Sequence, residues 1–444
     1  MSADVSSLRR PRVKPEHRAY RTVDGHVRIG SVVYGIGAEI ADPHGWVWLL
    51  VEAMDGSRDP AAVIACVRAG HPAVAGADVR QAMADLLAAG FVEDAAAPVP
   101  VPDRERERYS RGVPLLRWMD LGPRASAWEA QLLLRRARVL LLGIGGTGGY
   151  AAQSLVASGV GHLHCVDPDV VELSNLNRQP LYRESDIGHP KVDAALRTLR
   201  ALNSDVTVTG ERREARGMGD LADLVSGGRR AGGDSPVDGV SGDGVSGDGV
   251  SGDGITAEGV TGDGVTGHGI TAEGVTADDV SATGDTGAPG DCPPTRPVYD
   301  LLVLAADRPL DLRRWANRVC LAAGLPWVDA GYRGPLVTAG VYVPGRGACW
   351  ECLRAGEADR RELRLAPGQD EDVASPRLPW NPASAVTAGL SGGLLAHAAL
   401  SLLTGVPALE PGVRFGVNLM VPGDRVLQRF PRRTDCPACG DAPR

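Results

Sequence analysis

A glycine-rich turn set between two apolar runs is the feature of this sequence that most constrains its fold. Residues 138–167 (RVLLLGIGGTGGYAAQSLVASGVGHLHCVD) begin with an apolar run, pass through the turn and a helix-like segment, and end with a second apolar run. Strand, turn, helix and strand in this order are typical of the opening of a doubly wound α/β domain. Residues 297–307 (PVYDLLVLAAD) are predicted to form a later strand. We therefore predict an α/β fold.

The same turn indicates a nucleotide ligand. It has glycines where missing side chains let backbone N–H groups and a helix N-terminus approach a phosphate, namely Gly143, Gly145, Gly146 and Gly148. Asp167 ends the second strand, 24 residues after Gly143, where a carboxylate can accept hydrogen bonds from a ribose. An NAD-dependent oxidoreductase would show both features, so this turn alone leaves the chemistry open.

The residues that follow Asp167 favour ATP. The run PDVVELSNLNRQ (168–179) contains Arg178 and is followed by DIG (186–188) and by Lys191. The segment thus carries two cationic side chains. A dehydrogenase has no need of these cations here, whereas an enzyme that acts on ATP must neutralise three phosphates.

This run resembles the ThiF/MoeB/HesA superfamily, relatives of the ubiquitin-activating enzymes, and the resemblance covers residues 108–236 and 298–444. It implies a Rossmann-like sheet and an adenylyltransferase, in which the C-terminal carboxylate of a substrate attacks the α-phosphate of ATP to give an acyl-adenylate and pyrophosphate. The implied cofactors are ATP and Mg²⁺. The residues implied to serve them are Asp167 and Asp169 for the nucleotide, Asn175, Arg178 and Lys191 for the phosphates, and Asp307 for Mg²⁺.

A second short segment bears on the oligomeric state. Arg108-Tyr109-Ser110-Arg111 is similar to the family's N-terminal segment, whose last arginine reaches into the nucleotide site of the partner subunit. The resemblance thus implies a homodimer, with Arg111 acting in trans. An ordinary ion pair of Arg111 within a linker is the alternative. The sequence departs from the family pattern at Gly112, where glutamine is usual, and at Arg308, where a small polar residue is common.

Two Cys-x-x-Cys pairs indicate a metal. Cys349 and Cys352 form one pair, and Cys436 and Cys439 form the other, which together can supply four thiolates to a closed, structural Zn²⁺ site. The sequence has no cysteine between 353 and 435, where family members that form a thioester or persulfide carry one. Covalent transfer to the enzyme's own sulfur is therefore disfavoured.

The first 97 residues predict a separate small domain. A β-hairpin is expected over 24–36, followed by three helices that end at Gly90, which together suggest a winged-helix-like α+β module. Its layout resembles the PqqD-like recognition domain of enzymes that modify ribosomal peptides, where a leader peptide adds a strand to the hairpin. Dimerisation or packing is the alternative role. Residues 98–107 are predicted to be a linker.

Charge and composition exclude several partners. Residues 237–297 carry a five-residue Gly-rich repeat that cannot cover a core, so we predict a disordered insert there. The net charge is −8, and these residues hold 11 Asp/Glu and one Arg, so the rest of the chain is close to neutral, −8 + 10 = +2. We therefore expect no nucleic-acid partner and no membrane partner. The uncharged stretch 381–409 is predicted to be a buried helix and the protein cytoplasmic.

Two functions from different classes therefore remain beside a nicotinamide oxidoreductase. The first is ATP-dependent adenylation of the C-terminal carboxylate of a ribosomal precursor peptide or a small carrier protein. The second is a non-catalytic protein that binds a leader peptide and presents it to a heterocyclase in azole-peptide biosynthesis. The glycine turn, Arg178, Lys191 and Asp307 favour the enzyme, because a scaffold has no physical use for them.

Overall fold

A mixed eight-stranded sheet forms the centre of the structure, a computed structural model that describes residues 5–228, 297–360, 378, 381–421, 423 and 425–440. The repeat insert predicted at 237–297 lies outside the described residues, apart from Pro297. The sheet has the order β13-β12-β11-β10-β9-β6-β7-β8. Its strands are β6 (Arg138–Leu142), β7 (His162–Val166), β8 (Thr207–Glu211), β9 (Leu301–Leu304), β10 (Trp327–Arg333), β11 (Leu336–Tyr342), β12 (Val413–Asn418) and β13 (Arg425–Arg429).

Five of these strands form the predicted doubly wound half. Strands β8, β7, β6, β9 and β10 are parallel, and the order reverses between β6 and β9. Strands β11, β12 and β13 extend this half with antiparallel pairs. In open α/β sheets, ligands bind beyond the carboxyl ends of the strands at such a reversal. The topology therefore places a binding site next to the ends of β6 and β9.

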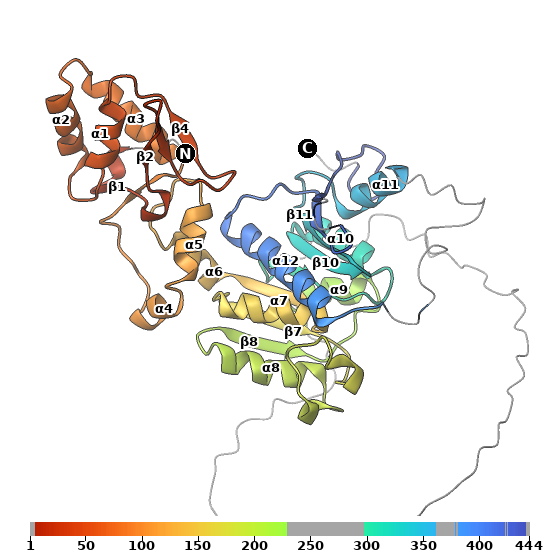
Figure 1. Ribbon diagram of the computed structural model, residues 1–444. Coiled ribbons are helices and arrows are strands. Elements are labelled where there is room, and N and C mark those ends of the chain that lie inside the picture. Colours follow the sequence, from red (N-terminus) through yellow and green to blue (C-terminus); the bar gives the residue numbers. More distant parts are fainter. Residues whose placement is uncertain are drawn as a thin grey trace, which may run out of the picture. The chain divides into compact units, whose positions relative to one another are not determined.

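Helices cover both faces of the sheet (Figure 1). Strand β6 shows why both faces must be covered: Val139 and Leu141 point into one hydrophobic core, and Leu140 and Leu142 into the other. All four side chains are buried, as expected of a parallel strand enclosed on both sides. The first core includes α6 (Glu129–Arg136), α7 (Gly146–Ala157), α8 (Lys191–Leu202) and α12 (Ala385–Thr404), and the second includes α9 (Met218–Val225), α10 (Leu312–Ala323) and α11 (Trp350–Arg360).

Helix α12 accounts for the long uncharged stretch of the sequence. Its N-cap Ser384 accepts a hydrogen bond from the Thr387 N–H, and it ends at Gly405, which has a φ of 73°. Among the described residues, it is the one helix long and apolar enough to cross a membrane, and half of its most apolar window is buried. Because it packs against α7, β10 and β11, it is a core helix of this fold, as predicted.

The first hundred residues form a small α+β module. Its helices pack on a hydrophobic core of their own that includes Val27, Leu50 and Met83. The expected hairpin over 24–36 is present in part: the Asp24-Gly25 turn joins β2 to β3, but Val32 and Tyr34 are exposed in a loop and the third strand lies later. The elements are β1 (Pro11–Val13), β2 (Tyr20–Arg21), β3 (Val27–Ile29), β4 (Ala38–Ile40), α1 (Trp46–Ala53), α2 (Pro60–Gly70), α3 (Gly76–Ala88) and β5 (Val92–Asp94), with short 3₁₀ turns at Val5–Ser7 and Pro15–His17.

Helices α4 (Asp103–Arg108) and α5 (Gly112–Met119) follow the module, so α4 begins within the segment predicted as a linker. Buried donors of the module reach the C-terminal end of α5. Lys14 Nζ donates to the Asp120 carbonyl at 2.9 Å, and His17 Nε2 lies 3.0 Å from the carbonyl of Trp118. These carbonyls belong to the groups that a helix end leaves without an internal partner. The module is thus hydrogen-bonded to the residues that lead into the α/β sheet.

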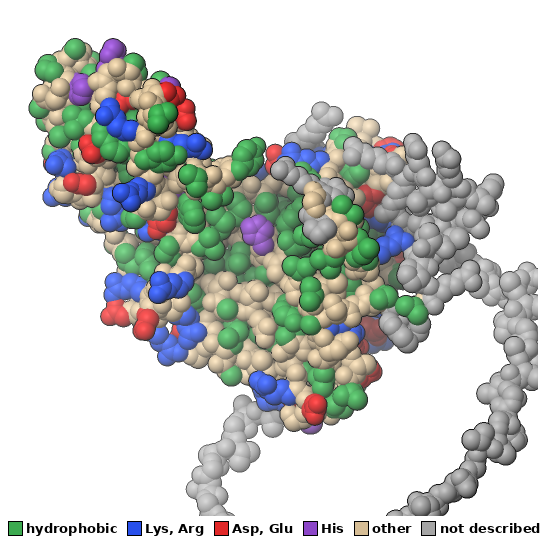
Figure 2. Space-filling view, in the orientation of Figure 1, with side chains coloured by type: hydrophobic (Ala, Val, Ile, Leu, Met, Phe, Trp, Pro, Cys, Tyr) green, Lys and Arg blue, Asp and Glu red, His purple; other side chains and the backbone are tan. Residues whose placement is uncertain are grey.

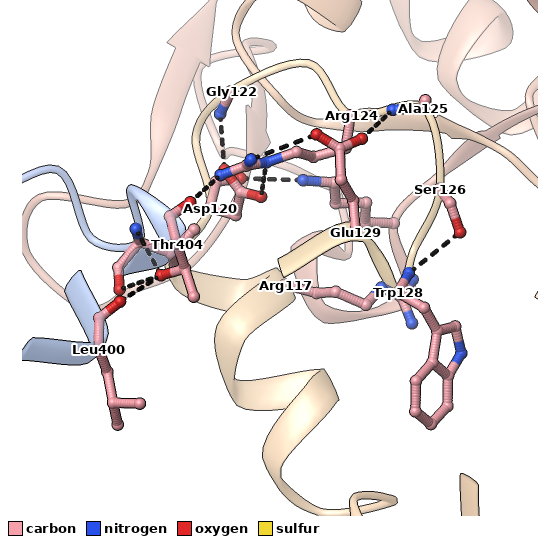
Figure 3. Close-up of polar contacts among 12 residues, drawn as sticks. Arg117, Asp120, Gly122, Arg124, Ala125, Ser126, Trp128, Glu129, Leu400 and Thr404 are labelled. Atoms are coloured by element: carbon pink, nitrogen blue, oxygen red, sulfur yellow. Dashed lines mark hydrogen bonds and ion pairs between the residues drawn. The ribbon is translucent and has the colours of Figure 1, made fainter. Parts of the chain in front are cut away.

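The segment after α5 is tied to the end of α12 by one arginine. Arg124 Nε donates to Asp120 at 2.7 Å, and its Nη2 donates to the Thr404 carbonyl at 2.9 Å (Figure 3). Glu129 Oε1 lies 3.4 Å from Arg124 Nη1. The Asp120 carbonyl therefore accepts a hydrogen bond from Lys14 of the module, and the Asp120 carboxylate accepts one from Arg124. Because Arg124 also bonds the end of α12, the module and α12 are anchored to the same turn.

We expect this anchoring to weaken in acid. Burial, and then the nearby Lys14 charge, lower the pKa of His17, so the folded protein favours the neutral ring. Stability should therefore fall as pH drops below about 6.5, the usual pKa of histidine, by about 1.4 kcal/mol for each unit between the two pKa values. His17→Gln keeps a donor but cannot titrate. In thermal melts between pH 7.5 and 5, the wild type should lose more stability than His17→Gln; parallel losses would contradict this role for His17.

Candidate active site

A cavity of 640 Å³ opens at the carboxyl ends of β6, β7, β8 and β9. It is the place where the strand order reverses and where the topology predicts a ligand. Eight of the residues expected from the sequence line it, namely Gly143, Gly145, Gly146, Asp167, Asp169, Arg178, Lys191 and Asp307. The fold thus brings together residues up to 164 positions apart in the sequence, counted from Gly143 to Asp307.

The glycine turn beside this cavity packs closely against neighbouring backbone. Gly143 has a φ of 86°, and a Cβ there would lie 2.8 Å from the backbone N of Ala306 after β9. A Cβ at Gly148 would overlap the Gly143 carbonyl oxygen, which explains why this glycine is needed although it does not line the cavity. Helix α7 starts at Gly146, so its first N–H groups face the cavity. This arrangement suits a phosphate.

Asp167 holds the turn from the neighbouring strand. Its two carboxylate oxygens accept hydrogen bonds from the Ile144 and Asp169 N–H groups, at 2.8 and 2.9 Å. Burial raises the pKa of Asp167, and the Lys191 ammonium opposes that change. The carboxylate therefore fixes the loop backbone and borders the cavity, where a ribose hydroxyl could reach it.

The two predicted cations reach the cavity from separate segments. Lys191 is the first residue of α8, its side chain is 7% exposed, and its Nζ lies 2.8 Å from Asp169 Oδ2. Arg178 Nη1 donates a hydrogen bond to the Ser174 carbonyl at 2.8 Å. Asn175 lies outside the cavity lining: its Oδ1 accepts from the Glu172 N–H at 3.1 Å and so shapes the turn that carries Arg178.

Asp307 is the carboxylate that the sequence associates with magnesium. It follows β9, its side chain is 61% exposed, and Arg313 Nη2 lies 3.1 Å from its Oδ1. A carboxylate oxygen beside a space for phosphates is the donor set that Mg²⁺ takes with nucleotides. The residues present therefore fit Mg²⁺, and Asp307 would hold it.

Arg111 stands apart from the cavity of its own chain. It is the exposed N-cap residue of α5 and does not line the cavity. Among the described residues, no hydrogen-bond or ion-pair partner of its side chain is found. The preceding Tyr109 is buried, and its hydroxyl accepts a hydrogen bond from Asn203 at 3.0 Å. The chain is thus anchored immediately before a free arginine.

Other cavity residues escaped the sequence motifs. Arg213 follows β8 and is 8% exposed, with its Nη2 donating to the Asp220 carbonyl at 3.2 Å. Tyr332 also lines the cavity. Gln179, the last residue of the run 168–179, and Arg308, the departure from the family pattern, line it too. Arg213 could have been found from its place after a parallel strand. Tyr332 could not, because it lies within β10 and its approach depends on the order of the strands.

The four predicted zinc ligands form one buried cluster at another place in the fold. Cys349 Sγ lies 3.8 Å from Cys352 Sγ and 3.6 Å from Cys436 Sγ, and Cys352 Sγ lies 3.5 Å from Cys439 Sγ. Tetrahedral Zn–S bonds of about 2.3 Å require S···S separations of roughly 3.8 Å. Asn317 Nδ2 lies 3.6 Å from Cys349 Sγ and can support a thiolate there. The residues present therefore fit a structural zinc ion.

Known proteins resemble this chain in sequence and in fold. Molybdopterin-synthase adenylyltransferase of Salmonella typhimurium is 41% identical over 107 residues, which are 24% of this chain and 40% of that protein. SAMP-activating enzyme E1 of Haloferax volcanii is 44% identical over 110 residues, 25% of this chain and 37% of that protein. The matches thus span about 40% of these relatives' lengths.

The likeness to solved structures extends over almost the whole chain. The crystal structure of E. coli MccB superposes with a TM-score of 0.65 at 19% identity and covers 97% of both chains. Other MccB structures contain ATP or N-formylated MccA and superpose with TM-scores of 0.60 and 0.61, at 18% and 19% identity, covering 97% of this chain and 99% of theirs. At such identities the likeness concerns the fold.

A sequence model of the ThiF family matches residues 116–227 and 292–438, which is more than half of the chain. These segments include the glycine turn, Arg178, Lys191 and Asp307, the groups that the fold gathers around the cavity. The chain belongs to the ThiF family.

Proposed function

We propose that this protein uses ATP to adenylate the C-terminal carboxylate of a ribosomal precursor peptide or a small carrier protein. The observation that carries the proposal is the meeting of Arg178, Lys191 and Asp307 with the glycine turn in one cavity of 640 Å³. The three side chains come from separate segments, and together they offer a phosphate two cations and a metal-binding carboxylate. Relatives named as adenylyltransferases and the MccB structures with ATP support this assignment.

The reaction forms one bond and breaks another. A carboxylate oxygen of the substrate attacks the α-phosphorus of ATP, the bond from that phosphorus to the bridging oxygen breaks, and pyrophosphate leaves with the electron pair. Bound Mg²⁺ would neutralise phosphate charge. Arg178 and Lys191 would stabilise the charge that moves onto the leaving pyrophosphate, and the glycine turn would orient the α-phosphate. No nucleophilic side chain is needed, in keeping with the lack of cysteine between 353 and 435.

The N-terminal module is proposed to bind the substrate chain. Strands β2 and β4 are the edges of its three-stranded sheet, and an extended peptide could add a strand there. Solved structures of MccB with N-formylated MccA support a peptide as the substrate class. We infer that the module acts as a PqqD-like recognition domain, held in place through Lys14 and His17.

A homodimer would complete the site. Arg111 is exposed and does not line its own cavity, so it could act on the nucleotide of a partner subunit. Figure 2 shows hydrophobic side chains gathered on the face where α5 and α12 lie in Figure 1. The exposed apolar residues of these helices include Leu115 at 53%, Val386 at 63% and Leu390 at 37%. Such a face suits a second copy of the chain.

Peptide-dependent ATP–pyrophosphate exchange tests the proposal. The purified, zinc-loaded protein should exchange labelled pyrophosphate into ATP only when Mg²⁺ and a matching peptide or carrier protein are present. Amidation of the peptide's C-terminus should abolish exchange, because the attacking carboxylate is gone. No exchange with any co-encoded peptide, together with leader binding and a pathway that survives Asp307→Ala, would instead support the leader-presenting protein.

A further inference from the structure

We propose that Arg313 is a positioning residue that orients the Asp307 carboxylate toward the metal–nucleotide complex, and that buried Asp329 anchors Arg313 for this task. The inference rests on the proposed function, because it concerns the same cavity. It assigns a role to an arginine that no sequence motif singled out and that does not itself line the cavity.

Arg313 joins an exposed carboxylate to a buried one. Its Nη2 lies 3.1 Å from Asp307 Oδ1, and its Nε lies 3.0 Å from Asp329 Oδ2. The Asp307 side chain is 61% exposed, whereas that of Asp329 is 5% exposed. Among the described residues, no partner of Asp307 Oδ2 is found. One oxygen of Asp307 is thus held, and the other stays available to a cation.

The anchor of Arg313 belongs to a buried row of charges. On the other side of Asp329 lies Arg414, whose Nη2 is 3.9 Å from Asp329 Oδ2 and whose Nη1 is 2.7 Å from Glu357 Oε1. The row runs from the cavity edge through α10, β10 and β12 to α11, with alternating sign. Because a buried carboxylate left without its cation is strongly unfavourable, Asp329 keeps the Arg313 guanidinium in place.

Stability alone does not account for the contact with Asp307. Arg313 already bonds Asp329 and donates to the Ala330 carbonyl at 3.4 Å. An ion pair to an exposed carboxylate contributes little to stability. The contact does, however, fix where the Asp307 carboxylate points, and partners that orient a metal-binding group typically change metal affinity by about 10- to 100-fold.

The test measures how far Mg²⁺ strengthens ATP binding. The intact, zinc-loaded protein is titrated calorimetrically with ATP, once without and once with Mg²⁺. The quantity compared is the ratio of the Kd without Mg²⁺ to the Kd with Mg²⁺. In Arg313→Met this ratio should fall by about tenfold relative to wild type, with ATP binding in the absence of Mg²⁺ nearly unchanged. Arg313→Lys can reach one carboxylate and should recover part of the ratio.

Two control variants separate positioning from stability. Arg314→Met removes an adjacent arginine that pairs with Asp311 at the surface, and it should leave both the ratio and the Tm unchanged. Arg414→Met breaks the buried row beyond Asp329 while Arg313 keeps its contacts with both carboxylates. It should lower the Tm and preserve the ratio.

The results distinguish the inference from the proposed function. If the wild type binds ATP more tightly with Mg²⁺ and Arg313→Met keeps the full ratio, the positioning role is wrong while the proposed function stands. The positioning role is also wrong if Arg414→Met lowers the ratio as much as Arg313→Met, since the effect is then one of general packing. If the wild type binds no ATP with or without Mg²⁺, both fail.

Discussion

Replacing Lys191 with Met is expected to lower peptide-dependent ATP–pyrophosphate exchange by about 100- to 1,000-fold, the loss typical of removing one preorganised charge-stabilising group. The Lys191 side chain is 7% exposed, and its ammonium lies at the start of α8 on the cavity wall. Its partner Asp169 is 62% exposed, so a bound triphosphate can share or replace that contact. Methionine keeps most of the length of the side chain and removes the charge together with its N–H donors.

A matched control lies on the same helix. Arg197 pairs with Asp186 at 2.7 Å, and its side chain is 59% exposed, away from the cavity lining. Arg197→Met should therefore exchange pyrophosphate at the wild-type rate within about twofold, because exposed ion pairs contribute little. Exchange in Lys191→Met within threefold of wild type, with the same peptide and with Mg²⁺, would refute the role of Lys191.

The inactive Lys191→Met protein also provides a test of the trans arginine. Mixed with Arg111→Ala, it can form heterodimers in which one site has both its own Lys191 and the partner's Arg111. Recovery of activity on mixing two inactive variants would therefore support both the homodimer and Arg111 in trans. If mixtures of proven heterodimers stay inactive, Arg111 does not act across subunits.

The parts of the structure that the sequence predicts well are those set by local pattern. The fully apolar runs of β6 and β9 indicate strands buried on two faces, and this is what Val139, Leu140, Leu301 and Leu302 show. The glycine turn is equally local, because the space at Gly143 is limited by the chain itself and by the next strand. The mixed α/β sheet and its match to the MccB fold confirm this part of the prediction.

The sequence does not predict which distant segments lie next to each other in the fold. Strand β1 pairs with β5, so that Pro11 lies opposite Asp94, and nothing in either short segment reveals the other as its partner. Arg313 and Asp329 meet because α10 lies against β10, and the sequence around each looks like an ordinary helix start or strand. Tyr332 joins the cavity for the same reason. Such contacts depend on the order of strands, which pattern and spacing do not determine.

The largest expected effect on stability belongs to the cysteine cluster. Cys352 is fully buried on α11, and its Sγ also accepts the Arg433 N–H at 3.4 Å. Structural zinc contributes about 10–16 kcal/mol in zinc-finger peptides, and a loss of only about 4 kcal/mol lowers the Tm of a large domain by roughly 10 °C. Cys352→Ala should therefore lower the Tm by more than about 10 °C and abolish bound zinc.

Cys320→Ala is the matched control, because Cys320 is also fully buried but lies outside the cluster. It should retain one zinc ion per chain by elemental analysis and melt within about 5 °C of wild type, as expected for a small change in core volume. Burial raises the pKa of the Cys349 and Cys439 thiols, so zinc must displace protons to bind. A chelator should accordingly remove zinc faster at pH 6 than at pH 8. Equal melting of both cysteine variants, with no zinc in the wild type, would show that the four thiols pack as apolar side chains.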